Sequence, residues 1–198
     1  MLTPEQRTEL GFPADLIAKV ERDAGSEAEP FFVSVVVPSE NLKGEKGFEK
    51  EKLTGFSVRT KKAEELITSF RAGLRVKGYL IFRSHKSYGD LPDIVTVVKG
   101  NNSYDILKIQ GTEASNYRLD TKAIIGWLKS QQQQGTFVIT GAGSDWLEAR
   151  FIKQPDNMSV FAKKVNAFAP DVLAHGPRTV EKLAAKMKKT NSFHLEWD

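Results

Sequence analysis

The amino-acid sequence predicts an α+β fold, a two-layer sandwich in which helices pack on a mixed or antiparallel sheet. Apolar residues alternate with polar ones in some segments and recur every three or four residues in others, the patterns of strands and of amphipathic helices. These segments follow one another as strand, helix, paired strands, helix and strand. That order favours an α+β sandwich over a doubly wound parallel sheet, in which single strands alternate with helices.

The composition restricts the chemistry that the chain can carry. There is no cysteine among the 198 residues, which excludes disulfides, thiolate nucleophiles, iron–sulfur clusters and cysteine-based zinc sites. No apolar run reaches the roughly 18 residues that span a bilayer. The N-terminus also lacks the basic and apolar regions of a secretory signal. We therefore expect a cytoplasmic protein without a membrane partner.

The charge and the length bound the partners and the domain organisation. The net charge is +4 at pH 7, from 29 Lys and Arg and 25 Asp and Glu. Residues of both signs are interspersed, whereas phosphate binding requires clustered cations, so we expect no nucleic-acid partner. The length suits one main domain with an extension. We expect residues 1–76 to form a helical and strand extension packed on a main α+β domain of residues 77–198.

The N-terminal segment is predicted to begin with two short helices and a strand. Thr3 caps the first helix, with Pro4 at its first position, and the second helix begins at Pro13. Residues 31–37 are β-branched and aromatic, which indicates a largely buried strand. Residues 40–55 mix glycine with charge and show no apolar period, so we expect an exposed loop.

A longer helix and two strands are predicted next. Thr60 is expected to cap the helix, and Gly78 ends it. Its apolar face consists of Ala63, Leu66, Ile67, Phe70 and Leu74. Strands follow at "YLIFRSH" and "DIVTVVKG", joined by the loop "KSYGDLP", and "SYDILKIQG" then predicts a short helix.

Another helix and a β-hairpin come after these strands. Asp120 is a suitable cap for "TKAIIGWLKSQQQQG", and Gly135 is the expected stop. The segments "TFVIT", "GAGSD" and "WLEARFI" predict strand, turn and strand. The glycines of this turn do not continue into a GxGxxG or GxxxxGK[ST] pattern, so a hairpin is favoured over a phosphate-binding loop.

The last third is predicted to form two helices and a final strand. The apolar face of the first helix consists of Val160, Phe161, Val165 and Phe168. The second helix is capped by Thr179, and its apolar face consists of Val180, Leu183, Ala184 and Met187. In the final strand Phe193, Leu195 and Trp197 alternate with His194, Glu196 and Asp198, so one face is predicted to be buried.

Four of these segments carry a resemblance to a known family. The segments "TEASNYRLDTKAIIGWL", "FVITGAGSDWLEARF", "FAKKVNAFAPDVLAHGPRTVEKLA" and "FHLEWD" resemble a bacterial family, domain of unknown function 4253, from Gly78 to Asp198. We associate that family with a Cys-Pro-Asp motif, a downstream glycine before a capped helix, and a Trp-Asp ending. Ala169 replaces the cysteine here, while Pro170, Asp171, Gly176, Thr179, Trp197 and Asp198 fit. The resemblance implies no particular activity or cofactor.

The bend between the last two helices has two interpretations. In the structural one, Pro170 ends the first helix, Asp171 caps the turn that follows, and Gly176 leads into the next helix. In the functional one, Asp171 and His175 converge on a binding site, either with Asp145 and Glu148 or with the final strand. A weaker candidate is a metal site, because oxygen and imidazole ligands share one face of the final strand. Its ligands would be His194, Glu196 and Asp198.

Two classes of function remain. The first is a non-catalytic binding or interaction domain whose partner is another protein, and one version of it is an immunity-type inhibitor of a bacterial toxin. The alternative is a hydrolase-type enzyme that uses Asp171 and His175 with a nearby carboxylate. Neither interpretation requires a cofactor.

Overall fold

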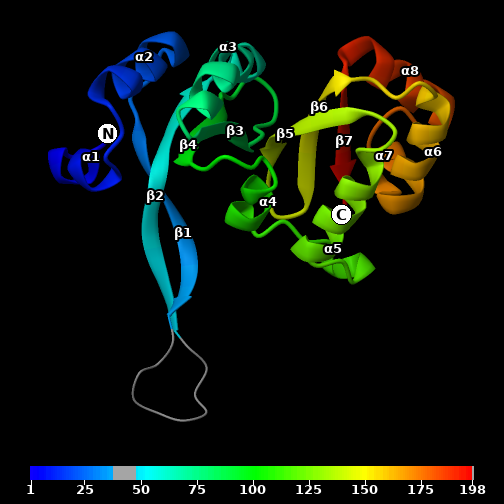
Figure 1. Cartoon of the computed structure of the whole chain (residues 1–198), viewed down its shortest axis with the longest axis horizontal. Coiled ribbons are helices and arrows are strands. Elements are labelled where there is room, and N and C mark those ends of the chain that lie inside the picture. The colour runs from blue at the N-terminus through cyan, green and yellow to red at the C-terminus, as the bar shows by residue number, and fades with distance from the viewer. Residues whose placement is uncertain (38–47, 198) are drawn as a thin grey trace. The chain divides into compact units, whose positions relative to one another are not determined.

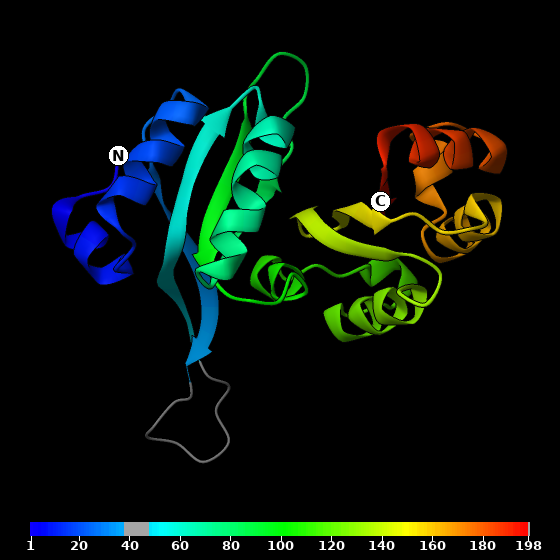
Figure 2. The ribbon, with the colours of Figure 1, turned by 45° about the horizontal axis from the view of Figure 1, so that its top comes forward.

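The structure is a computed structural model that describes residues 1–37 and 48–197 of the chain. The chain folds into two compact units (Figures 1 and 2). Unit 1 contains residues 1–81 and 86–101, and unit 2 contains residues 82–85 and 102–198. The strand order is β1-β2-β4-β3-β5-β6-β7, and the pairs include both parallel and antiparallel ones. The predicted α+β class is confirmed.

Unit 1 is built on antiparallel strands and three helices. Its elements are α1 (Pro4–Leu10), α2 (Ala14–Ala24), β1 (Glu29–Val37), β2 (Phe48–Thr60), α3 (Ala63–Val76), the beginning of β3 (Tyr79–His85) and β4 (Asp93–Lys99). Both β1 and β4 pair antiparallel with β2. One apolar core joins the helices to the strands, and Phe56 within it is fully buried, with its ring in edge-to-face contact with that of Phe12. Thr3 caps α1 as predicted, with a capping box to Gln6.

Two predictions about the strands of unit 1 are wrong. Residues 48–55, predicted to be part of an exposed loop, belong to β2, while residues 40–47 lie outside the described residues. They form a strand because β1 pairs with them, with Val33 opposite Lys52. Lys52 is exposed, and the charged residues around it do not alternate with apolar ones, so the sequence of this part of β2 lacks the usual strand pattern. The partner β1 is the outermost strand of the order and Phe32 is 42 % exposed, so β1 is not a largely buried strand.

The start of α3 also differs from the prediction. Thr60 is the last residue of β2 and does not cap the helix. Its hydroxyl instead accepts a hydrogen bond from the backbone N–H of Lys62, which occupies the cap position. The predicted apolar face of α3 is confirmed, since all five of its residues are buried. The helical period therefore located the helix, whereas the cap position depended on where the preceding strand ends.

Unit 2 combines four strands with five α-helices in the described residues. Its elements are the end of β3, α4 (Asp105–Gln110), the 3-10 helix η1 (Ser115–Tyr117), α5 (Thr121–Gln131), β5 (Thr136–Ala142), β6 (Trp146–Lys153), α6 (Met158–Phe168), α7 (Asp171–Ala174), α8 (Val180–Thr190) and β7 (Ser192–Glu196). β3 and β5 are parallel, and β5, β6 and β7 are antiparallel neighbours. Asp120 caps α5 as predicted, although the helix ends at Gln131, before Gly135.

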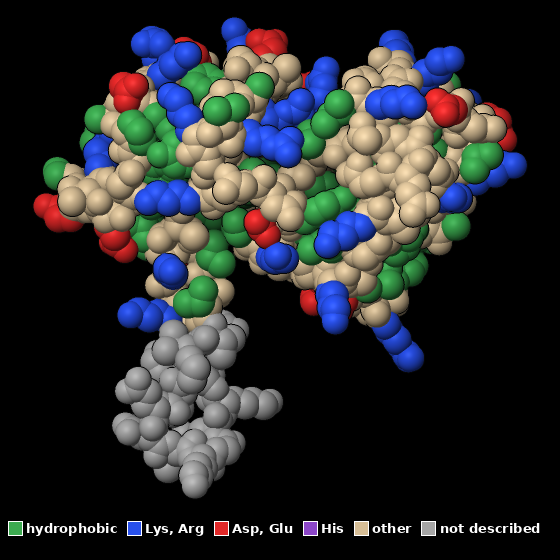
Figure 3. Space-filling view, in the orientation of Figure 1, with side chains coloured by type: hydrophobic (Ala, Val, Ile, Leu, Met, Phe, Trp, Pro, Cys, Tyr) green, Lys and Arg blue, Asp and Glu red, His purple; other side chains and the backbone are tan. Residues whose placement is uncertain are grey.

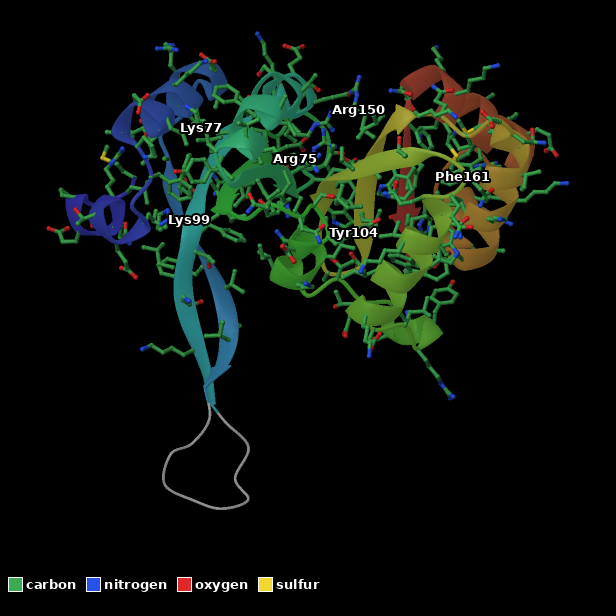
Figure 4. All side chains as sticks on the ribbon, in the orientation of Figure 1. Arg75, Lys77, Lys99, Tyr104, Arg150 and Phe161 are labelled. Atoms are coloured by element: carbon green, nitrogen blue, oxygen red, sulfur yellow. The ribbon has the colours of Figure 1, made fainter. Side chains whose placement is uncertain are left out.

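The apolar core of unit 2 is rich in phenylalanine. Phe161 of α6 lies with its ring centroid 5.5 Å from that of Phe151 on β6 and 5.2 Å from that of Phe193 on β7 (Figure 4). Edge-to-face contacts of this kind stabilise a core beyond simple burial. Val160, predicted to lie on the apolar face of α6, is 43 % exposed, so that face is narrower than predicted.

The bend between α6 and α8 contains one short helix. Ala169 has a non-helical backbone, with φ −133° and ψ 80°, as expected for a residue that precedes proline, and α6 ends before it. Asp171 is predicted to cap the turn, but it is the first residue of α7, and Pro170 occupies the cap position. Thr179 caps α8 as predicted, with its hydroxyl accepting from the N–H of Lys182 at 3.3 Å.

Candidate functional site

A row of paired residues crosses the four strands of unit 2. Arg83 on β3 pairs with Gly141 on β5, which pairs with Glu148 on β6, and Glu148 pairs with His194 on β7. Residues paired in this way place their side chains on the same face of a sheet. This face is opposite to the one that carries Phe193 and the aromatic core.

Arg83 and Glu148 form an ion pair across the glycine between them. Arg83 Nη1 lies 2.5 Å from Glu148 Oε2, and the side chains are only 14 % and 21 % exposed. A Cβ on Gly141 would lie 3.2 Å from the Cβ of Arg83 and 3.2 Å from Cζ3 of Trp146. A larger residue on β5 would therefore compete with Arg83 for the path to Glu148.

Two imidazoles share one carboxylate next to this row. His194 Nε2 lies 3.5 Å from Glu196 Oε2 on the same strand, and His175 Nδ1, which follows α7, lies 3.8 Å from Glu196 Oε1. The short helix α7 packs against β7, and this places His175 at the end of the strand. One carboxylate thus accepts contacts from a residue of the helical bend and from a residue of the final strand.

An indole ring completes this surface. Trp146 pairs with Glu196 across β6 and β7, and its ring is stacked at 26° over His194, with 6.1 Å between the centroids. The turn before β6 comes close to the ring, because a Cβ on Gly143 would lie 2.2 Å from Trp146 Nε1. We use the term polar face for the six side chains Arg83, Trp146, Glu148, His175, His194 and Glu196.

Asp171 lies one helical turn before His175 and has a different partner. The hydroxyl of Tyr117, in η1, donates a hydrogen bond of 2.7 Å to Asp171 Oδ2. This hydrogen bond to a carboxylate raises the pKa of Tyr117 above its usual value of 10.0. The backbone N–H of His175 donates to the carbonyl of Asp171, which closes the turn of α7. Asp171 therefore links the bend to η1.

The structure brings together four of the residues singled out in the sequence, namely Glu148, His175, His194 and Glu196. Asp145 is exposed in the turn between β5 and β6, where its carbonyl accepts from the N–H of Trp197. Asp198, the third ligand of the weaker metal candidate, lies outside the described residues. Within residues 1–37 and 48–197, no three His, Asp or Glu side chains are grouped so that they could hold a metal ion.

Arg83, Gly141, Trp146 and Tyr117 were not among the site residues predicted from the sequence. The partner of Arg83 is 65 positions away in the chain, and that of Tyr117 is 54 positions away. A signal for Arg83 was present, because a charged residue that directly follows the apolar "YLIF" segment of a strand needs a partner when it is not fully exposed. The identity of that partner depends on the strand register.

Comparison with known proteins gives one match. A family model described as "Domain of unknown function (DUF4253)" matches residues 94–198, which is just over half of the chain. Neither the curated proteins nor the solved structures include a match to the chain. In the part of the chain that the structure describes, no helix is both long enough and apolar enough to span a membrane. All of the polar face except Arg83 lies within the matched residues.

Proposed function

The chain belongs to the DUF4253 family, and we propose that it is a non-catalytic binding domain that recognises another protein through the polar face of unit 2. The observation that carries this proposal is the pairing of the charged groups on that face. Arg83 is paired with Glu148, and both imidazoles contact Glu196. Groups that are already held in place lose little freedom when a partner binds, which favours affinity.

The residue types on the polar face also support a protein partner. Arginine and tryptophan are the residues in which the binding energy of protein interfaces is most often concentrated. His175 and Glu196 are 46 % and 34 % exposed, so a partner can reach them. The two carboxylates, the Arg83 guanidinium and the two imidazoles offer hydrogen-bond acceptors and donors to a polar partner surface.

The immunity-type inhibitor of a bacterial toxin is the specific version of this proposal. Its support is the small, cysteine-free chain together with a preorganised charged surface. Co-expression with toxin genes found next to the gene for this protein tests that version. Protection that disappears when Glu196 is replaced by Gln supports it, and lack of protection by the wild-type protein contradicts it.

The hydrolase alternative makes a different use of the same residues. The contact of His175 with Glu196 is the observation that favours it, because a carboxylate that orients an imidazole is part of many acid–base sites. Such a site also needs an activated nucleophile or water. The contacts of His175 and His194 with Glu196 join base to acid and do not by themselves supply such a nucleophile.

The experiment that separates the two functions uses one set of variants in two assays. Tagged wild-type protein is cross-linked in its native cells, and the captured partner is purified and titrated by calorimetry. Glu196→Gln is expected to weaken that binding at least about tenfold, or about 1.4 kcal/mol. Glu181→Gln, at an exposed position of α8, is the matched control and leaves affinity unchanged.

The same proteins are then assayed with ester, phosphate and peptide substrates. Turnover by the wild-type protein that is lost in His175→Ala would refute a non-catalytic role and support the hydrolase. Equal affinity of wild-type and Glu196→Gln protein for the partner, with no turnover, would show that binding does not use the polar face.

A further inference from the structure

We propose that the exposed side of α6 and α8 binds the phosphate backbone of double-stranded nucleic acid. The net positive charge of the protein is concentrated in this helical layer. From Met158 to Thr190 the chain has seven Lys or Arg and two Asp or Glu, a net charge of +5. The remaining 165 residues have 22 Lys or Arg and 23 Asp or Glu, a net charge of −1.

These seven cationic side chains are accessible. They are all exposed, and they are Lys163, Lys164, Arg178, Lys182, Lys186, Lys188 and Lys189. None of them forms an ion pair with a described residue, in contrast to Arg7, Arg59 and Arg83 in the rest of the protein. Lys and Arg side chains are visible over α8 at the top right of Figure 3. Their counter-ions must therefore come from outside the protein.

The spacing of the lysines on α8 suits a repeating anion. Lys182, Lys186 and Lys189 lie on one side of α8, about 6 Å and about 4.5 Å apart along its axis. The opposite side of the helix, with Leu183 and Met187, is buried. α6 packs beside α8 and adds the exposed Lys163 and Lys164 to the same layer. A helix C-terminus favours lysine, which accounts for Lys188 and Lys189 but not for the others.

The chemistry of this surface favours a duplex over other polyanions. Between residues 158 and 190 the one exposed large apolar side chain in the described structure is Val160. Protein interfaces are depleted in lysine and rely on aromatic or apolar anchors, which this layer does not present. Single strands are bound largely by stacking on aromatic rings, but Phe161 is buried and Phe168 is stacked on Trp127. Contacts of lysine with duplex phosphates need only positioned point charges.

This inference departs from the expectation drawn from the overall composition. We expected no nucleic-acid partner because positive and negative residues are mixed along the whole sequence. A count over the whole sequence does not show whether the cations gather on one surface of the folded protein. Counter-ion release depends instead on cations that gather on one surface without protein partners. The inference is independent of the polar face, so either proposal can fail without the other.

The test measures the binding of the full chain to a fluorescently labelled random-sequence duplex by anisotropy. Non-specific affinity of about 10⁻⁴–10⁻⁶ M at physiological salt is expected, and it falls steeply as salt increases. The triple variant Lys182→Gln, Lys186→Gln, Lys189→Gln is expected to reduce the slope of log affinity against log salt by about three. Glutamine is a good helix former, so α8 is retained.

The matched control removes the same charge from unit 1, with Lys50→Gln, Lys52→Gln and Lys61→Gln, all at exposed positions. This control is expected to keep the wild-type salt slope. A second variant of the proposed surface, Lys163→Gln with Lys164→Gln, tests the contribution of α6 and is expected to reduce the slope by about two.

Two kinds of result would overturn the proposal. The first is no binding to the duplex, or an equal loss in the α8 triple variant and in the unit 1 control. The second is binding to polyglutamate or to anionic lipid vesicles at least as tight as to the duplex at the same salt concentration. That result would assign the surface to an acidic polypeptide or to a membrane.

Discussion

The close approach of Trp146 to Gly143 leads to a strong prediction about the stability of unit 2. Gly143 is buried, and its backbone is held on both sides. Its N–H donates to the carbonyl of Trp146, and its carbonyl accepts the hydroxyl of Thr112 at 2.7 Å. Replacing Gly143 by Ala adds a Cβ that would lie 2.2 Å from Nε1 and 2.8 Å from Cε2 of the indole.

The magnitude follows from the distance that the ring must move. Unbonded heavy atoms are most stable at about 3.5–4.0 Å, so the indole or the turn must shift by more than about 1 Å. The ring has little free space, because it is stacked over His194 and also approaches Gly141. Overpacking of this kind costs about 1–3 kcal/mol. We expect Gly143→Ala to lower the free energy of unfolding by that amount.

Urea denaturation followed by tryptophan fluorescence measures this effect in the correct unit. All three tryptophans lie in unit 2, so their emission reports on the unfolding of that unit. The control is Gly126→Ala in α5, where an added Cβ meets nothing within 4 Å. Alanine is the better helix former, so this control is expected to gain up to about 1 kcal/mol. A Gly143→Ala variant as stable as the wild type or as the control would refute the close packing of Trp146.

Three further predictions concern individual contacts of unit 2. In a double-mutant cycle with Arg83→Met and Glu148→Gln, the coupling energy is expected to be about 1–3 kcal/mol. This value lies between those of exposed and buried ion pairs, because both side chains are partly buried. A coupling energy near zero would contradict the ion pair. The pKa of the Tyr117 hydroxyl, taken from the absorbance difference between wild type and Tyr117→Phe, is expected above 10.0 and is expected to fall in Asp171→Asn. Because the folded state holds the phenol proton more tightly, this stabilisation is complete below a pH of about 10 and is lost as pH rises through the folded pKa. If Asp171→Asn leaves the pKa of Tyr117 unchanged, the hydrogen bond between Tyr117 and Asp171 is contradicted. Finally, Thr112→Val keeps the shape of a fully buried side chain but leaves the carbonyl of Gly143 without its hydrogen-bond donor. We expect this change to lower the free energy of unfolding by about 1–3 kcal/mol in the urea assay. An unchanged free energy of unfolding would show that the hydroxyl is dispensable.

Much of the secondary structure could be predicted because it is encoded over short distances. In α3 and α8 the apolar residues recur at the helical period, and in α8 a threonine stands at the cap. β7 alternates buried and half-buried residues as predicted. These patterns are local because helical hydrogen bonds join residues four positions apart and strand side chains alternate with a period of two.

The strand over residues 48–55 could not be predicted in the same way. Its charged, glycine-flanked sequence shows no apolar alternation, and it becomes a strand because β1 pairs with it. The same holds for the start of α3, where the end of β2 decides which residue occupies the cap position. In both places a partner that is remote or already folded overrides the local preference.

The candidate site shows the same division. From the sequence alone, Glu148 and His175 were candidate binding residues, His194 and Glu196 were weaker candidates for metal ligands, and thiol chemistry was excluded. Only the tertiary structure decided that these side chains meet, and that Arg83 joins them, because the register of four strands brings together residues far apart in the chain. A one-residue shift in that register would send each side chain to the opposite face. Residue type is a property of the chain, whereas proximity across a sheet is a property of its long-range pairing.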